Sequence, residues 1–257
     1  MFRLSMSVIA LFAIVLIGNS TSQAEQITIV TGEWVPYTGS RLPEGGPYAK
    51  KVAEVFDRVG SDVKFEFYPW KRTAVMVENG QMIAAMPFVK TPERVERFLF
   101  PDTPVVTQRL YVYFRKDRFP NGIHANSFQS LKDQDIRLVS VLGYSQTEAM
   151  KKLGGVVEEV ATEDLAWKVL LAGRVDAFTS VEGAADVTAR AALGNRYDEI
   201  GRSSKPFYER DLFVVFSKNH PRGLQLLKQW DAAFANCIVD TTVEESGGDL
   251  CEPGIRY

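Results

Sequence analysis

One tryptophan and two arginines between residues 65 and 104 are the side chains best suited to bind a small charged molecule. Trp70 and Arg72 stand where a predicted strand turns into a helix, and Arg94 lies in a Thr-Pro-Glu-Arg helix start. A guanidinium group binds a carboxylate through two parallel hydrogen bonds, and an indole ring can face either an apolar group or a cation. These residue types therefore indicate a pocket for a small anionic or zwitterionic ligand.

Two more aromatic side chains, Trp34 and Tyr37, lie in a Pro- and Gly-rich loop after the first predicted strand. Aromatic residues in such a loop often face a cleft, but they can equally cap the core. Trp70 has the same alternative, because it can pack against the predicted helix 47–59. The pattern leaves both interpretations open.

The composition is that of an ordinary folded protein. The chain has 257 residues, of which 46% are hydrophobic and 24% charged, with a net charge of -2 and a pI near 5.8. This length suits one large domain or two lobes of about 100 residues each. A nucleic-acid surface would need an excess or a stripe of Lys and Arg, and the sequence has neither.

The first 24 residues are predicted to be a signal peptide. Arg3 precedes an apolar run from residue 4 to residue 17, and Ser22-Gln23-Ala24 has the small-x-small pattern of a cleavage site. The run is about 14 residues long, which is short for a membrane span, although an uncleaved anchor is the alternative. We therefore expect an exported protein whose mature chain begins at Glu25.

Export makes a disulfide between Cys237 and Cys251 the expected state of these two cysteines, which are the only ones in the chain. Closing a loop of about 15 residues would add on the order of 3 kcal/mol of stability in the chain-entropy model. A metal site is not expected, because His124 and His220 are the only histidines. No cofactor is predicted either.

Strands and helices alternate in two similar series. Short alternating or continuous apolar runs mark the strands, and N-cap residues such as Thr91 and Thr162 mark helix starts. The run 83–89 is almost entirely apolar, as in a central strand covered on both faces. Strands are predicted at 26–32, 63–69, 83–89, 107–117, 136–143, 156–162, 175–181 and 210–219, and helices at 47–59, 70–78, 91 onward, 145–153, 163–174, 182–193 and 221–237.

The last predicted strand and helix, at 210–219 and 221–237, are too few elements to form a third α/β series of their own. The final helix is predicted to bury Leu224, Leu227, Trp230, Ala233 and Phe234. The economical solution is that this tail returns to the first lobe.

Such a return predicts two α/β lobes linked by two strands near 108–113 and 206–213. The first lobe would comprise residues 25–108 and 213–257, and the second residues 109–212. The carboxyl ends of the strands would then face each other across a cleft. A single continuous doubly wound sheet is the structural alternative.

The segments TGEWVPYTG, FYPWKRTAVMVENG and FVKTPERVERFLFPDTPV resemble the periplasmic solute-binding proteins of ABC importers, in the polar amino-acid class known as bacterial solute-binding family 3. Similar segments in the second half are LVSVLGYSQT, LLAGRVDAF and DLFVVFSKNHP. The resemblance implies a two-lobed type II periplasmic-binding-protein fold that closes like a Venus flytrap. A Pro-Trp-x-Arg signature places the chain near a divergent branch of that family.

The resemblance assigns site residues position by position. Arg94 matches the family arginine that receives a ligand carboxylate, although a surface pair with Glu93 or Glu96 is the alternative. Ser145, Gln146 and Thr147 match a second-lobe loop that opens a helix after a glycine, where backbone N–H groups favour an anion. A plain helix cap is the alternative for that loop.

Two departures from the family pattern concern the ammonium group of an amino acid. Hydroxyl or small residues usually precede the Thr-x-x-Arg, whereas Met86-Pro87-Phe88-Val89 stands there in this chain. The family aspartate is replaced by Val181, and the nearest carboxylate is Glu182, which can meet an ammonium or simply begin a helix. The expected ligand set is thus Trp34, Tyr37, Trp70, Arg72, Arg94, Ser145, Gln146 and Glu182.

The leading hypothesis is a monomeric, non-enzymatic binding protein that delivers a small polar or carboxylate-bearing solute to a membrane permease. One alternative is an enzyme on the same scaffold, similar to cyclohexadienyl dehydratases, with Glu33 or Glu182 as the acid or base. Another is a soluble sensor lobe that reports to a receptor. None of these three hypotheses includes a nucleic-acid partner.

Overall fold

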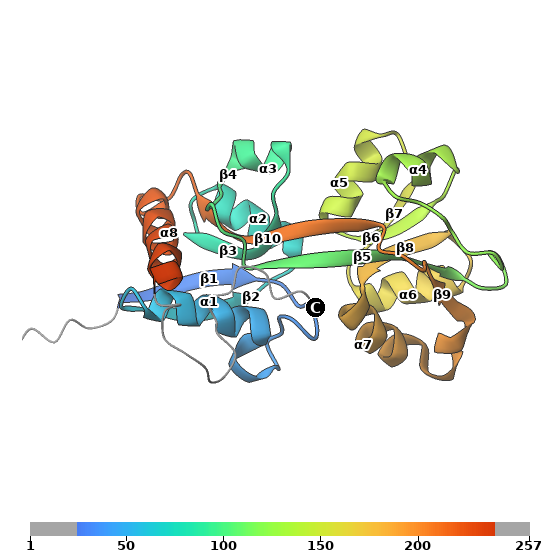
Figure 1. Cartoon of the computed structure of the whole chain (residues 1–257), viewed down its shortest axis with the longest axis horizontal. Coiled ribbons are helices and arrows are strands. Elements are labelled where there is room, and N and C mark those ends of the chain that lie inside the picture. The colour runs from blue at the N-terminus through green and yellow to red at the C-terminus, as the bar shows by residue number, and fades with distance from the viewer. Residues whose placement is uncertain (1–24, 240–257) are drawn as a thin grey trace, which may run out of the picture.

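The structure is a computed structural model that describes residues 25–239, and it consists of two α/β lobes joined by two long strands (Figure 1). The predicted signal peptide at 1–24 and the predicted Cys237–Cys251 disulfide lie outside the residues whose side chains are described. Among the described residues, no helix is both long and apolar enough to cross a bilayer.

The first lobe is built on a short sheet with strand order β2-β1-β3-β10. β1 pairs in parallel with β2, for example Ile29 with Phe65, and with β3 on its other side. Every residue of β3 is buried, as its apolar run predicts. The elements of this lobe are β1 (Glu25–Thr31), the 3-10 turn Pro43–Gly45, α1 (Pro47–Asp57), β2 (Ser61–Phe67), α2 (Trp70–Glu78), β3 (Ala84–Val89), α3 (Pro92–Arg97), β4 (Phe98–Leu99) and α8 (Gly223–Val239).

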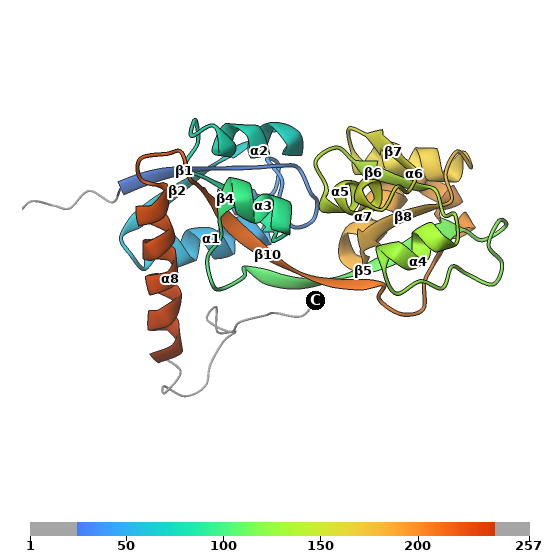
Figure 2. The same cartoon turned by 90° about the horizontal axis from the view of Figure 1, so that it is seen from above.

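The second lobe repeats the arrangement with a sheet in the order β5-β8-β6-β7. β6 pairs in parallel with β7 and β8, and helices lie above and below the sheet in Figure 1. Figure 2 shows the same lobe from above, beside the first lobe. Its elements are α4 (Phe128–Asp133), β6 (Leu138–Val141), α5 (Ser145–Lys152), β7 (Val157–Val160), α6 (Glu163–Leu171), β8 (Ala177–Val181), α7 (Glu182–Leu193), the 3-10 helix Gly194–Glu199 and β9 (Ile200–Arg202).

Two strands, β5 (Val106–Arg115) and β10 (Tyr208–Ser217), run from one lobe to the other. They pair antiparallel from Leu212–Val106 to Tyr208–Leu110, and each then continues into the sheet of one lobe. The hydrogen-bonded path is therefore continuous, but its centre is an antiparallel ribbon rather than a doubly wound parallel sheet. The predicted two-lobed α/β fold is confirmed.

Local sequence signals explain where the helices begin. The Thr91 side chain accepts a hydrogen bond from the Arg94 backbone N–H at 3.3 Å, with Pro92 in the first helical position. Thr162 caps α6 in the same way, through the backbone N–H of Leu165. The short elements α4 and β9 were not predicted, because segments of three to six residues carry too little periodicity.

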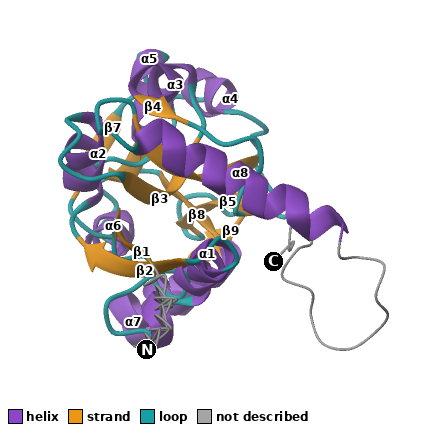
Figure 3. Cartoon of the chain, turned by 90° about the vertical axis from the view of Figure 1, so that its left-hand side faces the viewer, coloured by secondary structure: helices purple, strands orange, loops and turns teal. Residues whose placement is uncertain are grey.

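The buried face of α8 differs from the prediction at two residues. Leu224 is 54% exposed, whereas Leu226 is fully buried beside Trp230. Residues 226, 230, 233 and 234 follow the i, i+4, i+7, i+8 spacing of one helical face, and Leu224 lies outside it. Figure 3 shows α8 lying across the outer end of the first lobe, where Trp230 contacts Phe56 of α1.

Candidate ligand-binding site

A cavity enclosing about 370 Å³ of space not filled by atoms, part of it open to solvent, lies between the lobes. Both lobes and a connecting strand contribute to its wall. The first lobe supplies Trp34, Trp70, Pro87, Phe88, Val89 and Arg94, the second lobe supplies Gly143, Tyr144, Ser145 and Gln146, and β10 supplies Arg210 and Leu212.

Trp70 spans the gap between the lobes. Its ring packs directly on the backbone of Gly32, where an added Cβ would lie only 2.4 Å from the indole. The ring also meets Phe88 of its own lobe and Tyr144 of the other lobe edge-on, at centroid distances of 6.3 and 6.4 Å. A glycine at position 32 is therefore needed for the indole to form this wall.

Trp34 is held by a tight turn in the loop after β1. The Trp34 N–H donates to the Thr38 carbonyl at 2.8 Å, and the Thr38 hydroxyl donates to the Gly32 carbonyl at 2.8 Å. Trp34 is 6% exposed and lines the cavity. Tyr37 points elsewhere: it stacks on Tyr48 at 4.7 Å and lines a separate cavity between the lobes.

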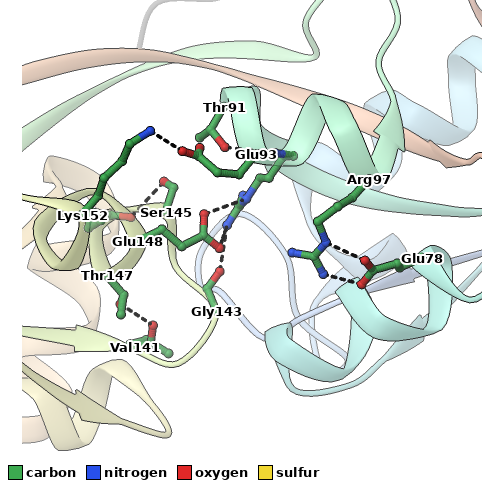
Figure 4. Close-up of polar contacts among 12 residues, drawn as sticks. Glu78, Thr91, Glu93, Arg97, Val141, Gly143, Ser145, Thr147, Glu148 and Lys152 are labelled. Atoms are coloured by element: carbon green, nitrogen blue, oxygen red, sulfur yellow. Dashed lines mark hydrogen bonds and ion pairs between the residues drawn. The ribbon is translucent and has the colours of Figure 1, made fainter.

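Arg94 is buried, and its guanidinium group reaches across to the other lobe. Nε and Nη2 lie 3.2 Å from the two carboxylate oxygens of Glu148, and Nη2 donates to the Gly143 carbonyl at 3.0 Å. Its partner is thus Glu148 rather than Glu93 or Glu96. Glu93 instead pairs with Lys152 of the second lobe, which adds a second contact between the lobes (Figure 4).

Ser145 and Gln146 begin α5 and line the cavity beside Arg94. Tyr144 stands at the N-cap without a side-chain cap bond, so no side chain of the cap covers the first N–H groups of the helix. The neighbouring Thr147 hydroxyl donates to the Val141 carbonyl at 3.4 Å and is buried. The start of α5 therefore presents a partial positive charge to the cavity.

Three residues of the predicted ligand set, Tyr37, Arg72 and Glu182, lie outside this cavity. Arg72 is exposed, with its guanidinium 4.7 Å above the Tyr68 ring. Glu182 forms an ion pair with Arg202 and lines the second cavity, together with Tyr37. The sequence could not determine the direction in which these side chains point.

Arg210 was not identified from the sequence. It lies on β10, its guanidinium carbon is 5.9 Å from the Trp34 ring centroid, and its Nε is shielded from solvent without a hydrogen-bond partner. Burial, together with the charge of Arg94, lowers the pKa of Arg210 to about 10, against the opposing effect of Tyr144. The only sequence signal was a charged residue near the start of an otherwise apolar strand.

A buried polar cluster lies behind the cavity wall. The Tyr144 hydroxyl donates to Glu163 Oε1 at 3.1 Å, and the Thr188 hydroxyl lies 3.0 Å from Oε2. The Trp167 indole N–H donates to Thr188 at 2.8 Å. Burial raises the pKa of Glu163 although both hydroxyls oppose the shift, and burial also raises the pKa of Tyr144. Both oxygens of Glu163 are therefore already engaged by the protein.

No protein-family model matches the sequence, and no curated protein sequence does. Solved structures do match. An ancestral arginine-binding protein bound to arginine superposes with a TM-score of 0.65 at 18% identity, over 86% of this chain and 95% of the other. A histidine kinase sensor domain similar to periplasmic binding proteins superposes with a TM-score of 0.68 at 13% identity, over 85% of this chain and 92% of the other. An ABC uptake transporter substrate-binding protein from Streptococcus pneumoniae, with bound histidine, gives 0.62 at 18% identity, over 84% and 87%.

The chain has the type II periplasmic-binding-protein fold. In this fold the cavity lies where strands of the two lobes end, since Trp34 follows β1, Phe88 lies near the end of β3 and Gly143 follows β6. Loops at the carboxyl ends of strands form the ligand sites of open α/β sheets. Within residues 25–239, no group of three or more His, Cys, Asp or Glu side chains is arranged to hold a metal ion.

Proposed function

We propose that this protein captures a small carboxylate-bearing solute between its lobes and delivers it to the membrane permease of an ABC importer. The observation that carries the proposal is a cavity walled by both lobes and containing the guanidinium groups of Arg94 and Arg210. Guanidinium groups favour carboxylates, and aromatic side chains around them exclude water and strengthen the attraction.

Binding would be coupled to closure of the lobes. We propose that residues 25–108 and 213–257 move against residues 109–212 through bending at 108–113 and 206–213, in the two connecting strands. A ligand that touches both walls of the cavity binds the closed form better than the open form, so it shifts the population toward closure. The permease would then recognise the closed form.

The same proposal includes a cleaved leader at 1–24, a periplasmic location and a Cys237–Cys251 disulfide. It also includes membership of a divergent Pro-Trp-x-Arg branch, which is supported by the position of Trp70 in the cavity wall. Arg72 of that motif gives no such support, because it is exposed outside the cavity.

A sensor lobe is the second candidate, favoured by the likeness to a histidine kinase sensor domain. An enzyme receives less support from the geometry. Glu182 pairs with Arg202 away from the cavity, and the exposed Glu33 accepts the Ser40 N–H at 3.2 Å. Neither carboxylate is placed to transfer a proton to a ligand in the cavity.

The test begins with native mass spectrometry of protein secreted from the full-length gene, followed by thermal denaturation and small-angle scattering with candidate solutes. We expect a bound small carboxylate, a raised melting temperature and a smaller radius of gyration on binding. An Arg72→Gln variant is the matched control and should behave like the wild type. A protein that retains no small molecule and responds to none would contradict the proposal.

Uptake measurements separate the importer from the sensor. In cells that lack the protein, accumulation of the labelled ligand should fall if the partner is a permease. Unchanged accumulation with altered transcription would favour the sensor.

A further inference from the structure

Arg210 is a partly buried cation that forms no ion pair within the described residues. Within residues 25–239 no carboxylate pairs with it, and its Nε meets no acceptor. It belongs to β10, one of the two strands common to both lobes, so its position does not depend on closure alone. A desolvated charge without a partner is costly, and groups in such an environment cluster at functional sites.

Arg94 repels Arg210, whereas the carboxylate of Glu163 attracts it without forming an ion pair within residues 25–239. Arg94 is paired with Glu148, and Glu163 receives the Tyr144 and Thr188 hydroxyls behind the cavity wall. None of the residues that line the cavity is an aspartate or a glutamate. The charge of Arg210 therefore has no carboxylate beside it in the cavity wall, and a bound anion would neutralise it.

The other unsatisfied groups of the cavity wall are also donors. Trp70 Nε1 is buried without a partner. Trp34 Nε1 is close enough to Glu163 to stabilise its charged form, yet meets no acceptor at hydrogen-bonding geometry. A ligand that fits these groups must offer acceptors rather than further N–H groups.

We infer that Arg210 receives the anionic group of the ligand, and that the ligand is a small carboxylate with a flat or apolar body and no ammonium group. This inference rests on the proposed function and narrows it. The rings of Trp34, Trp70 and Phe88 supply apolar walls for the body of the ligand. An ammonium group would face Arg210 with no carboxylate among the residues that line the cavity, and the Gly143 carbonyl already accepts a hydrogen bond from Arg94.

Matched pairs of compounds, with and without an amino group, test whether the ligand lacks an ammonium group. Calorimetric titration would compare 3-phenylpropionate with L-phenylalanine, 3-(4-hydroxyphenyl)propionate with L-tyrosine, and butyrate with L-2-aminobutyrate. We expect the member without the amino group to bind more tightly by about 30-fold or more, the effect of placing a like charge in a desolvated site.

Variants test the role of Arg210. Arg210→Gln should lower the affinity for the carboxylate compounds by about 30-fold or more. Arg72→Gln should change that affinity less than twofold. Arg210→Met serves as a second variant, with circular dichroism as a check on folding. Its ligand-free melting temperature should equal or exceed that of the wild type, because the variant removes a partly buried charge that forms no ion pair.

Two results would overturn the inference and leave solute binding intact. These are tighter binding of the amino acids, or full affinity in Arg210→Gln combined with loss of affinity in Arg94→Gln. A destabilised ligand-free Arg210→Met would also contradict it, since that would assign Arg210 a structural role. If no member of any pair binds and no molecule co-purifies, both the inference and the proposed function fail.

Discussion

Arg94 of the first lobe and Glu148 of the second form a two-pronged ion pair across the cleft, with both nitrogen–oxygen distances at 3.2 Å. The Arg94 side chain is 6% exposed and that of Glu148 is 40% exposed. In this arrangement a carboxylate of the protein itself occupies the guanidinium fork expected to hold a ligand. The pair therefore links the state of the lobes to the availability of Arg94.

Glu148→Gln should shift the ligand-free protein toward open lobes. Because Glu148 is partly exposed, the ion pair stabilises the closed form by only about 1 kcal/mol. Its loss should therefore raise the ratio of open to closed molecules about fivefold. Distances between spin labels on the two lobes would measure that ratio. Arg94→Gln should have a similar effect, and the double variant should add little to either single change. Glu78→Gln, which breaks a pair with Arg97 inside the first lobe, is the control and should leave the ratio unchanged.

Gly143→Ala should impair closure as well as strain the backbone. Gly143 has φ of +89°, and an added Cβ would lie 2.9 Å from the Lys71 backbone nitrogen and 3.1 Å from Trp70 Cβ, both in the other lobe. Gly154 has φ of +74° with nothing within 4 Å, so Gly154→Ala carries similar strain without the contact. We expect about a tenfold loss of ligand affinity only for Gly143→Ala, measured by calorimetry. Equal affinities in the two variants would contradict the close contact between the lobes.

Asp176→Asn should destabilise the second lobe by about 2 kcal/mol at pH 7. Asp176 is 5% exposed and accepts hydrogen bonds from Arg137 N–H, Nε and Nη2 at 3.0, 2.8 and 3.1 Å, while Arg118 lies 2.8 Å away. Burial raises the pKa of Asp176, but these partners outweigh it and hold the pKa below the ordinary value of 3.8.

The sign of the pH effect follows from that lowered pKa. The stabilising contribution of Asp176 is complete above the unfolded-state pKa of 3.8 and is lost as the pH falls through the lower folded-state value. Urea denaturation should therefore show a difference between wild type and Asp176→Asn that narrows below pH 3.8. Asp164→Asn is the control, because Asp164 forms an exposed pair with Lys168. It should change the free energy of unfolding little at any pH. A difference independent of pH would rule out the ionic contribution.

Leu226→Ala should lower the free energy of unfolding by about 2–4 kcal/mol, and Leu224→Ala should lower it by less than about 0.5 kcal/mol. Leu226 is fully buried, whereas Leu224 is 54% exposed two residues away on the same helix. Chemical denaturation of the two variants gives a comparison in which helix propensity is matched. A larger loss in Leu224→Ala would show that the other face of α8 is the buried one.

Local sequence signals predicted most of the fold. Thr91 with Pro92 marked the start of α3, and the apolar run of β3 marked a strand buried on both faces. These signals depend on residues within one or two turns of each other, so the sequence displays them directly. Leu224 was misassigned because alternative apolar positions on one helix differ only in which face meets the rest of the protein.

Site prediction was less complete, because a side chain's direction depends on distant segments. Trp34, Trp70, Arg94, Ser145 and Gln146 were named from the sequence and line one cavity. Arg72 and Glu182 were named on the same grounds but point away, toward Tyr68 and Arg202. Nothing in the neighbouring residues of the chain distinguishes these two outcomes.

The sequence by itself determined the α/β class, the two lobes, the helix starts and the concentration of Arg and Trp beside strand ends. Only the tertiary structure decided which of these side chains face each other. Glu148 meets Arg94 from 54 positions away, and Arg210 enters the cavity on a strand that returns from the second lobe. The physical reason is that electrostatic and packing partners are set by strand pairing and lobe closure, which bring together residues with no local relation in the chain.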